Sequence, residues 1–290
     1  MATSTRTFKM DASRARTLQS ALEEAGFDMK DAPYCTFSAK GDGVSVSHYE
    51  SGKLVVQGKE IAAFLERFVP ECTAAGSAPK EALIGADESG KGDYFGPLVC
   101  AAVALTPDIA RFLDEVPLQD SKTLSARDIA EAADTLRRVL PYEIVMIGPA
   151  KYNELYPKFN NVNTMLAWAH AKAITAVVAK SGVKKVLLDK FCEEHVVRRA
   201  LGLAAADLDF SMRVRAESEP AVAAASILAR DAFVRGLKKL EHEIGHPLPP
   251  GAGGPTEKAA RALVRAKGPS VLPSVAKMHF RTTEKILGEA

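Results

Sequence analysis

The sequence predicts an α/β fold in which a mixed sheet is flanked by helices and preceded by a small α+β domain. From residue 81 onward, apolar strand-like runs alternate with helical stretches, which is the pattern of an α/β domain. The first 70 residues instead carry short strand-like runs separated by turn signals. Residues 70–80, PECTAAGSAPK, have two prolines and no hydrophobic periodicity. We therefore expect a linker over 71–80, between domains at 1–70 and 81–290.

The N-terminal domain is expected to contain two helices and an antiparallel meander. Residues 13–25 place Leu18 and Leu22 on one helical face and end at Gly26, a residue suited to a helix C-cap. Strand-like runs follow at 34–40, 43–49 and 53–58, joined by KGDG and ESGK turn signals. The segment EIAAFLERF, 60–68, is expected to close the domain as a short helix.

The second domain is expected to combine five strands with three long helices. The Gly96-Pro97 connection is too short for a helical crossover, so the first two strands are predicted to be antiparallel and the sheet mixed. The strand runs are 82–87, 97–105, 142–148, 184–189 and 210–216, and the helical stretches are 126–140, 163–181 and 221–244.

Composition indicates a soluble globular protein. The 290 residues are 47% hydrophobic and 26% charged, with a net charge of +2 and no long run of like charges, so any basic surface must be local. Cys35, Cys72, Cys100 and Cys192 form no C-x-x-C pair, which argues against a zinc ribbon. The sequence shows neither a signal peptide nor an apolar run long enough to span a bilayer, so we expect a cytoplasmic protein without a membrane partner.

Carboxylates follow several of the predicted strands. Asp87 and Glu88 end the run ALIGAD, Asp189 ends KKVLLD, and Glu217 follows FSMRVRA. The C-terminal edge of a sheet is where α/β proteins collect their sites. Carboxylates crowded together repel one another without divalent cations, and hard oxygen ligands suit Mg²⁺ or Mn²⁺. The pattern therefore predicts a site for two metal ions.

The same stretch has the spacing of a nucleotide-binding P-loop. Gly85, Gly90 and Lys91 fit G-x-x-x-x-G-K, but Gly92 stands where that motif needs Ser or Thr. Two carboxylates inside the loop would also oppose a triphosphate. We therefore favour the metal site over an ATP site.

The motifs around these acids resemble a known family. GADESGKGDYFGPLVCAAV resembles the D-E-x-G-x-G signature of the type 2 ribonucleases H, and its lysine between the glycines is similar to bacterial ribonuclease HIII. The segments DSKTL, YPKFNNVNTMLAWAHA, LLDKF, AVAAASILAR and HFRTTEKIL resemble further family segments in the same order. TFSAKGDGVSVSHYESGKLVVQGK resembles the extra ribonuclease HIII domain, which has a fold like the TATA-binding protein and helps to hold substrate.

The resemblance implies an endonuclease that cuts the RNA strand of RNA/DNA hybrids and leaves 5′-phosphate and 3′-hydroxyl ends. The metal-binding and catalytic quartet carried over is Asp87, Glu88, Asp189 and Glu217, with Asp87 as the candidate to bridge two Mg²⁺ or Mn²⁺ ions. Glu217 occupies the slot where the type HII enzymes have Asp. The enzyme is expected to be a monomer.

Substrate contacts are expected from a backbone reader and from nearby basic and hydroxyl groups. In this interpretation the glycines of Gly90-Lys91-Gly92 let the main chain approach the minor groove, where a 2′-hydroxyl distinguishes RNA from DNA. Further candidates carried over by the resemblance are Ser121, Lys122, Ser226 and Arg230.

Two alternatives remain open from the sequence. The loop LPPGAGGPTEK lacks the tyrosine with which type HII enzymes support incision at a single ribonucleotide. We therefore expect good cleavage of hybrids with consecutive ribonucleotides and poor incision at a lone one. A type HII-like activity is the nearer alternative, and a non-catalytic hybrid-binding protein is the more distant one.

Overall fold

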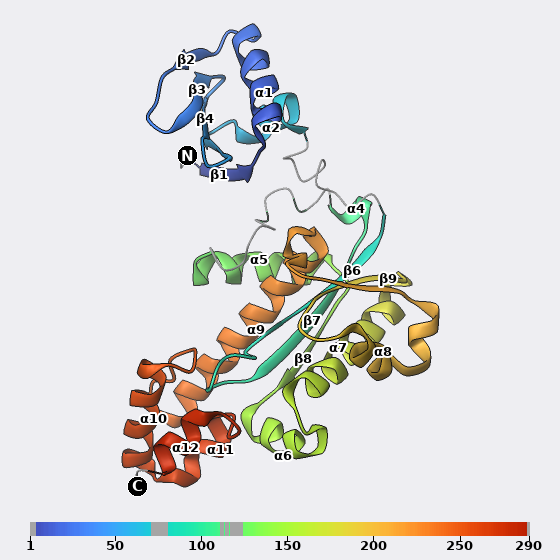
Figure 1. The fold of residues 1–290 in the computed structure, drawn as a ribbon, viewed down its shortest axis with the longest axis vertical. Coiled ribbons are helices and arrows are strands. Elements are labelled where there is room, and N and C mark those ends of the chain that lie inside the picture. The colour runs from blue at the N-terminus through green and yellow to red at the C-terminus, as the bar shows by residue number, and fades with distance from the viewer. Residues whose placement is uncertain (1–3, 71–80, 111–112, 114–115, 117–123, 289–290) are drawn as a thin grey trace. The chain divides into compact units, whose positions relative to one another are not determined.

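The computed structural model describes residues 4–70, 81–110, 113, 116 and 124–288. The chain divides into two compact units, 1–78 and 79–290, which are described separately. In Figure 1 the first unit carries β1 to β5 with α1 and α2, and the second carries the remaining elements.

The first unit is a five-stranded antiparallel sheet with two helices. The strand order is β1-β5-β4-β3-β2. The bounds are β1 Ser4–Lys9, α1 Ala12–Glu24, β2 Asp28–Lys30, β3 Cys35–Gly41, β4 Val44–Tyr49, β5 Lys53–Gly58 and α2 Ile61–Phe68. The predicted meander is confirmed as β3, β4 and β5, and both predicted helices are present.

Local sequence explains why α1 begins and ends where it does. The side chain of Asp11 accepts hydrogen bonds from the backbone N–H groups of Ser13 and Arg14, which caps the helix start. Gly26, just beyond the helix, has a positive φ of 78°. Leu18 and Leu22 are completely buried, so the amphipathic face predicted from sequence packs into the core of this unit.

The second unit is built on a mixed sheet with strand order β10-β9-β6-β7-β8. β6 pairs antiparallel with β7 and β7 antiparallel with β8, whereas β6 pairs parallel with β9 and β9 parallel with β10. The antiparallel start and mixed sheet predicted from Gly96-Pro97 are thus confirmed. The strands are β6 Leu83–Ser89, β7 Leu98–Leu105, β8 Tyr142–Ile147, β9 Lys185–Asp189 and β10 Asp209–Arg213.

The helices of this unit cover both faces of the sheet and the end at which β6 and β7 are connected (Figure 1). Their bounds are α4 Pro107–Ala110, α5 Ala126–Val139, α6 Pro149–Phe159, α7 Val162–Ser181, α8 Glu194–Leu201, α9 Pro220–Ile244, α10 Gly254–Lys267, α11 Leu272–Val275 and α12 Arg281–Leu287, with 3-10 turns η3 Gly202–Asp207, η4 Ala216–Ser218 and η5 Pro269–Val271. No helix in these described segments has the length and hydropathy needed to cross a membrane.

β6 separates the two helical layers because its side chains alternate between faces. Ile84 and Ala86 are buried in the cluster that includes residues of α7. Gly85, between them, faces α9 so closely that a Cβ atom would lie 2.1 Å from the carbonyl carbon of Ala221. The long helix α9 therefore packs directly on the backbone of the strand that carries Asp87.

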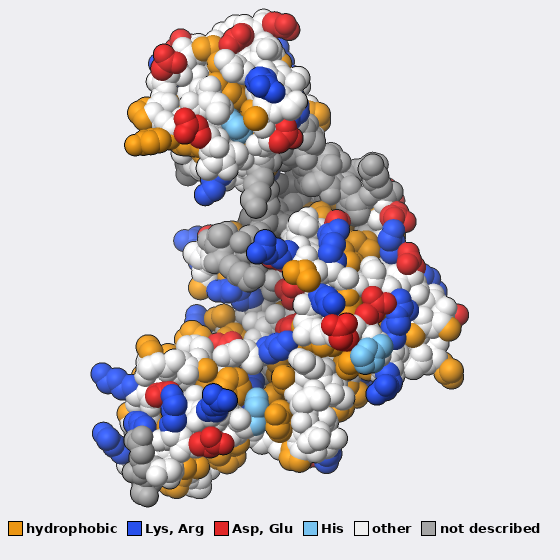
Figure 2. Space-filling view, viewed as in Figure 1, with side chains coloured by type: hydrophobic (Ala, Val, Ile, Leu, Met, Phe, Trp, Pro, Cys, Tyr) orange, Lys and Arg blue, Asp and Glu red, His pale blue; other side chains and the backbone are white. Residues whose placement is uncertain are grey.

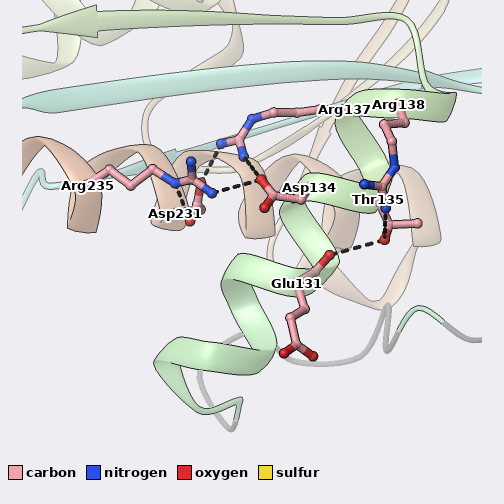
Figure 3. Close-up of polar contacts among 7 residues, drawn as sticks. All are labelled: Glu131, Asp134, Thr135, Arg137, Arg138, Asp231 and Arg235. Carbon is pink, nitrogen blue, oxygen red and sulfur yellow. Dashed lines mark hydrogen bonds and ion pairs between the residues drawn. The ribbon is translucent and has the colours of Figure 1, made fainter.

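An ion-pair network centred on the buried Asp231 joins α9 to α5 (Figure 3). Arg137 of α5 forms an ion pair with Asp231 of α9, whose side chain is only 4% exposed. Arg235 pairs with the same Asp231 at 2.8 Å and with Asp134 at 2.8 Å. Because these charges join two helices in the fold, they fix the position of the helix that carries Ser226 and Arg230.

The C-terminal segment is joined to the loop that follows β6. Tyr94 donates its backbone N–H to Gly251 at 2.9 Å, and the Asp93 carboxylate accepts from the N–H of Gly251 at 2.6 Å. The buried ammonium group of Lys277 donates to the backbone carbonyls of Asp93 and Gly96, both at 2.8 Å. Burial lowers the pKa of Lys277 to about 7. The loop between β6 and β7 is therefore held by residues far away in sequence.

Candidate active site

The register of the parallel strands brings the first two predicted acids to one edge of the sheet. Ala86 of β6 pairs with Leu188 of β9. Asp87 and Asp189 directly follow these partners, so both stand at the same level of neighbouring strands. The structure thus places the two acids on parallel neighbouring strands.

Glu217 reaches the same edge through a tight turn after β10. Arg213, the last residue of β10, pairs with Asp189. Arg215 then adopts a left-handed conformation with φ of 57°, and the 3-10 turn Ala216–Ser218 follows. The Asp189 carboxylate accepts a hydrogen bond from the backbone N–H of Ala216 at 2.9 Å, which ties this turn to β9.

The predicted residues line one cavity of about 290 Å³. It brings together the acids Asp87, Glu88, Asp189 and Glu217, the loop residues Gly90, Lys91 and Gly92, and Ser226 and Arg230 from α9. Ser121 and Lys122 lie outside the residues that the structure describes. Lys and Arg are interspersed with Asp and Glu on the visible face of this unit, without a single dominant basic patch (Figure 2).

The environment of Asp87 disfavours its negative charge. Burial raises the pKa of Asp87 to about 6, and the negative charges of Glu88 and Asp189 act in the same direction. Hydrogen bonds from the Ser226 side chain and from the Glu88 backbone N–H, the latter at 2.8 Å, oppose this rise. A divalent cation would favour the ionised form of Asp87.

The donor set fits a hard divalent cation. The acidic side chains of the cavity offer only oxygen atoms, the ligand type that Mg²⁺ and Mn²⁺ prefer. Within the described residues, however, no three His, Cys, Asp or Glu side chains already form a group arranged to hold a metal ion. The carboxylates share a cavity without being drawn together into a coordination sphere.

Sequence reasoning did not single out His170 as part of this site. This histidine lies on α7, is completely buried, and has its Nε2 atom 3.1 Å from Oε2 of Glu88. The available signal was a polar residue within the apolar helical run that contains Leu166, Ala169 and Ala173. That signal cannot reveal the partner, because Glu88 is 82 residues away in sequence.

The two glycines beside Lys91 have different surroundings. Gly90 has a φ of 87°, and a Cβ atom there would lie 2.2 Å from the carbonyl oxygen of Pro97. Gly92 is exposed, and a Cβ atom there would meet no atom of the described residues within 4 Å. The fold therefore requires glycine at 90, whereas at 92 it leaves open space beside the carboxylates.

The fold and the carboxylate-lined edge agree with the family match. The family model for ribonuclease HII matches residues 84–283, and a second model, a domain of unknown function (DUF3378), matches residues 6–80. The chain therefore belongs to the ribonuclease HII family.

Within that family, the chain matches ribonucleases HIII over nearly its full length. The chain is 43% identical over 288 residues to ribonuclease HIII of Protochlamydia amoebophila, covering 97% of this chain and 96% of that protein. It is 40% identical to ribonuclease HIII of Chlamydia pneumoniae, covering 94% and 95%. The resemblance to ribonuclease HIII that the sequence motifs indicated is thus confirmed.

Solved structures of ribonucleases HIII are similar to this chain in fold. The crystal structure of Bst-RNase HIII in complex with Mn²⁺ has a TM-score of 0.71 and 27% identity, and the match covers 99% of each chain. Aquifex aeolicus RNase H3 has a TM-score of 0.57 and 30% identity, covering 94% of this chain and 99% of that one. The fold predicted from sequence is therefore confirmed across both units.

Proposed function

We propose that this protein is an endoribonuclease that hydrolyses the RNA strand of RNA/DNA hybrids. The observation that carries the proposal is the single cavity in which Asp87, Glu88, Asp189 and Glu217 adjoin the glycine-lysine-glycine loop. The ribonuclease HII family match and the ribonuclease HIII names of its relatives support the same activity.

The acidic quartet would hold two divalent ions, Mg²⁺ or Mn²⁺, with Asp87 at the centre as the bridging ligand. When bound, such ions activate water for in-line attack and stabilise the leaving 3′-oxygen, which yields 5′-phosphate and 3′-hydroxyl ends. Asp189 is kept in place by the N–H of Ala216, and Glu88 by His170. The protein's own contribution is to hold these carboxylates around one cavity.

Other groups that line the same cavity would bind the hybrid. Gly92 leaves room for a ribose, and Lys91 stands beside it with its side chain about one-third exposed, at 34%. Ser226 and Arg230 project from α9, where basic and hydroxyl groups suit phosphate oxygens. Ser121 and Lys122 remain proposed contacts on the resemblance alone.

The first unit is proposed to hold substrate. A domain at 1–70, a linker at 71–80 and a catalytic domain at 81–290 would allow the small sheet to bind the hybrid while the acids cut it. We propose a cytoplasmic monomer. Deleting residues 1–75 is expected to weaken hybrid binding and to retain the carboxylate chemistry.

Cleavage of a labelled RNA/DNA hybrid with Mg²⁺ or Mn²⁺ tests the proposal, with wild type beside Asp87→Asn. The wild type is expected to cut and the variant to bind the hybrid without cutting. Equal binding with no cleavage by either protein would instead support a non-catalytic hybrid-binding protein.

A second substrate separates the two enzyme classes. A duplex with one embedded ribonucleotide is expected to be cut poorly compared with a hybrid that has several consecutive ribonucleotides. Equal rates on the two substrates would favour a type HII-like activity.

A further inference from the structure

The buried contact between His170 and Glu88 places a second residue behind a proposed metal ligand. His170 is 0% exposed, and its Nε2 lies 3.1 Å from Oε2 of Glu88, whose own side chain is 12% exposed. The contact joins α7, on one face of the sheet, to Glu88 near the C-terminal end of β6. Its meaning for the reaction rests on the proposed role of Glu88.

Hydrogen bonding decides which nitrogen of His170 carries the proton. The Glu88 carboxylate can only accept, so Nε2 must donate. The other ring nitrogen, Nδ1, is buried and has no hydrogen-bond partner among the described residues. A proton on Nδ1 would leave a buried N–H without an acceptor, which is costly. The geometry therefore favours the neutral ring with its proton on Nε2.

Aromatic packing holds the ring plane. Phe191 stacks on His170 with a centroid distance of 5.2 Å and an interplanar angle of 24°. The Lys91 ammonium lies 5.1 Å from the centroid of the Phe191 ring. The same ammonium is 3.8 Å from Oε1 of Glu88, so the four side chains form a closed ring of contacts.

The two carboxylate oxygens of Glu88 consequently have different contacts. Oε2 accepts a hydrogen bond from a fully buried donor, whereas Oε1 has a longer contact with a side chain that is 34% exposed. We propose that His170 is a positioning residue that fixes Oε2 of Glu88 and thereby presents Oε1 to the divalent cation. A partner that orients a carboxylate in this way raises metal affinity without touching the reacting atoms.

Two substitutions at His170 separate positioning from packing. Leu removes the donor and fills the space with apolar atoms, whereas the side-chain amide nitrogen of Gln can replace Nε2 as a donor. His170→Leu is expected to raise the half-saturating Mn²⁺ concentration for cleavage about tenfold, with KM for the hybrid changed less than about twofold at saturating metal. His170→Gln is expected to restore most of the metal affinity.

Val177→Ala is the matched control. Val177 is also fully buried on α7, in the cluster that packs against β6 and β9. The control is expected to lower thermal stability and leave the half-saturating Mn²⁺ concentration unchanged. An unchanged value in His170→Leu as well would overturn the positioning role.

Two readouts do not depend on cleavage. Mn²⁺ titration of the substrate-free protein by calorimetry should show the same weakening in His170→Leu. Nitrogen NMR of the wild-type His170 ring should show a protonated Nε2 and an unprotonated Nδ1, and a proton on Nδ1 would refute the assignment even if His170→Leu fails to fold. A wild type that binds Mn²⁺ but cuts no hybrid would refute the proposed function. The positioning role of His170 would then be decided by the calorimetric and NMR measurements.

Discussion

The two glycines around Lys91 allow fold and function to be separated by adding one methyl group at a time. At Gly90, alanine would have to adopt a φ of 87°, and its Cβ would lie 2.2 Å from the Pro97 carbonyl oxygen. The left-handed conformation costs about 1–2 kcal/mol, and overpacking costs about 1–3 kcal/mol. Gly90→Ala should therefore lower the free energy of unfolding by about 2–5 kcal/mol.

Gly92→Ala should behave in the opposite way. In the part of the chain that the structure describes, no atom lies within 4 Å of its Cβ position, so the free energy of unfolding should stay within about 1 kcal/mol of wild type. The methyl group would instead occupy space proposed for a ribose. We expect kcat/KM on a hybrid to fall at least tenfold, which corresponds to about 1.4 kcal/mol of transition-state stabilisation.

Urea unfolding and hybrid cleavage, measured on both variants, test this reasoning. Gly148→Ala is the matched control because a Cβ atom at Gly148 also meets nothing within 4 Å, its φ is −64°, and it lies outside the cavity. It should change neither property. Full activity in Gly92→Ala would refute the close approach of a ribose, and wild-type stability in Gly90→Ala would refute the steric argument.

Three further perturbations test the packing and the charges around the site. Gly85→Ala should cost about 3 kcal/mol or more in unfolding free energy, because its Cβ would lie 2.1 Å from the backbone of Ala221, and calorimetric melting measures this. Asp231→Asn should cost about 3 kcal/mol in urea unfolding, since it removes the buried carboxylate that compensates the charges of Arg137 and Arg235, and a loss below about 0.5 kcal/mol would contradict that view. Folding raises the pKa of Asp87 from 3.8 to about 6, so the folded state binds more protons between those values, and stability without divalent ions should fall as pH rises through that window. Asp87→Asn should remove this pH dependence of stability, and Mg²⁺ should reduce it, as measured by melting temperatures with and without a chelator. The same dependence of melting temperature on pH in the variant would show that other groups cause it.

Elements with strong local patterns were predictable from sequence. The hydrophobic pattern of each such element is contained in the element's own residues. This holds for the apolar runs that form β6, β7 and β9 and for the helical stretches that form α7 and α9. Asp87 and Asp189 are the last residues of two such runs, so the parallel pairing of β6 with β9 brings them to one edge of the sheet. Two strands of the first unit were missed. β1, Ser4–Lys9, is mostly polar, and β2, Asp28–Lys30, is only three residues long, so each is defined by its partner strand.

The partners behind the site could not be predicted because they are distant in sequence. His170 and Lys277 each stand in segments whose local pattern indicates only a buried helix or a C-terminal tail. Their roles depend on Glu88 and on the carbonyls of Asp93 and Gly96, which the fold brings to them. Such pairings follow from tertiary packing, which a single sequence does not display.

The Lys277 contact also bears on the order in which the protein can mature during synthesis. Every proposed metal ligand has left the ribosome well before residue 277, yet the loop after Gly92 gains its carbonyl contacts only when that lysine arrives. A nascent chain that stops short of this lysine would possess the complete acidic quartet and lack the support of the neighbouring loop. Nuclease activity would thus be expected only after residue 277 has been made, so that shorter products remain inactive towards cellular hybrids.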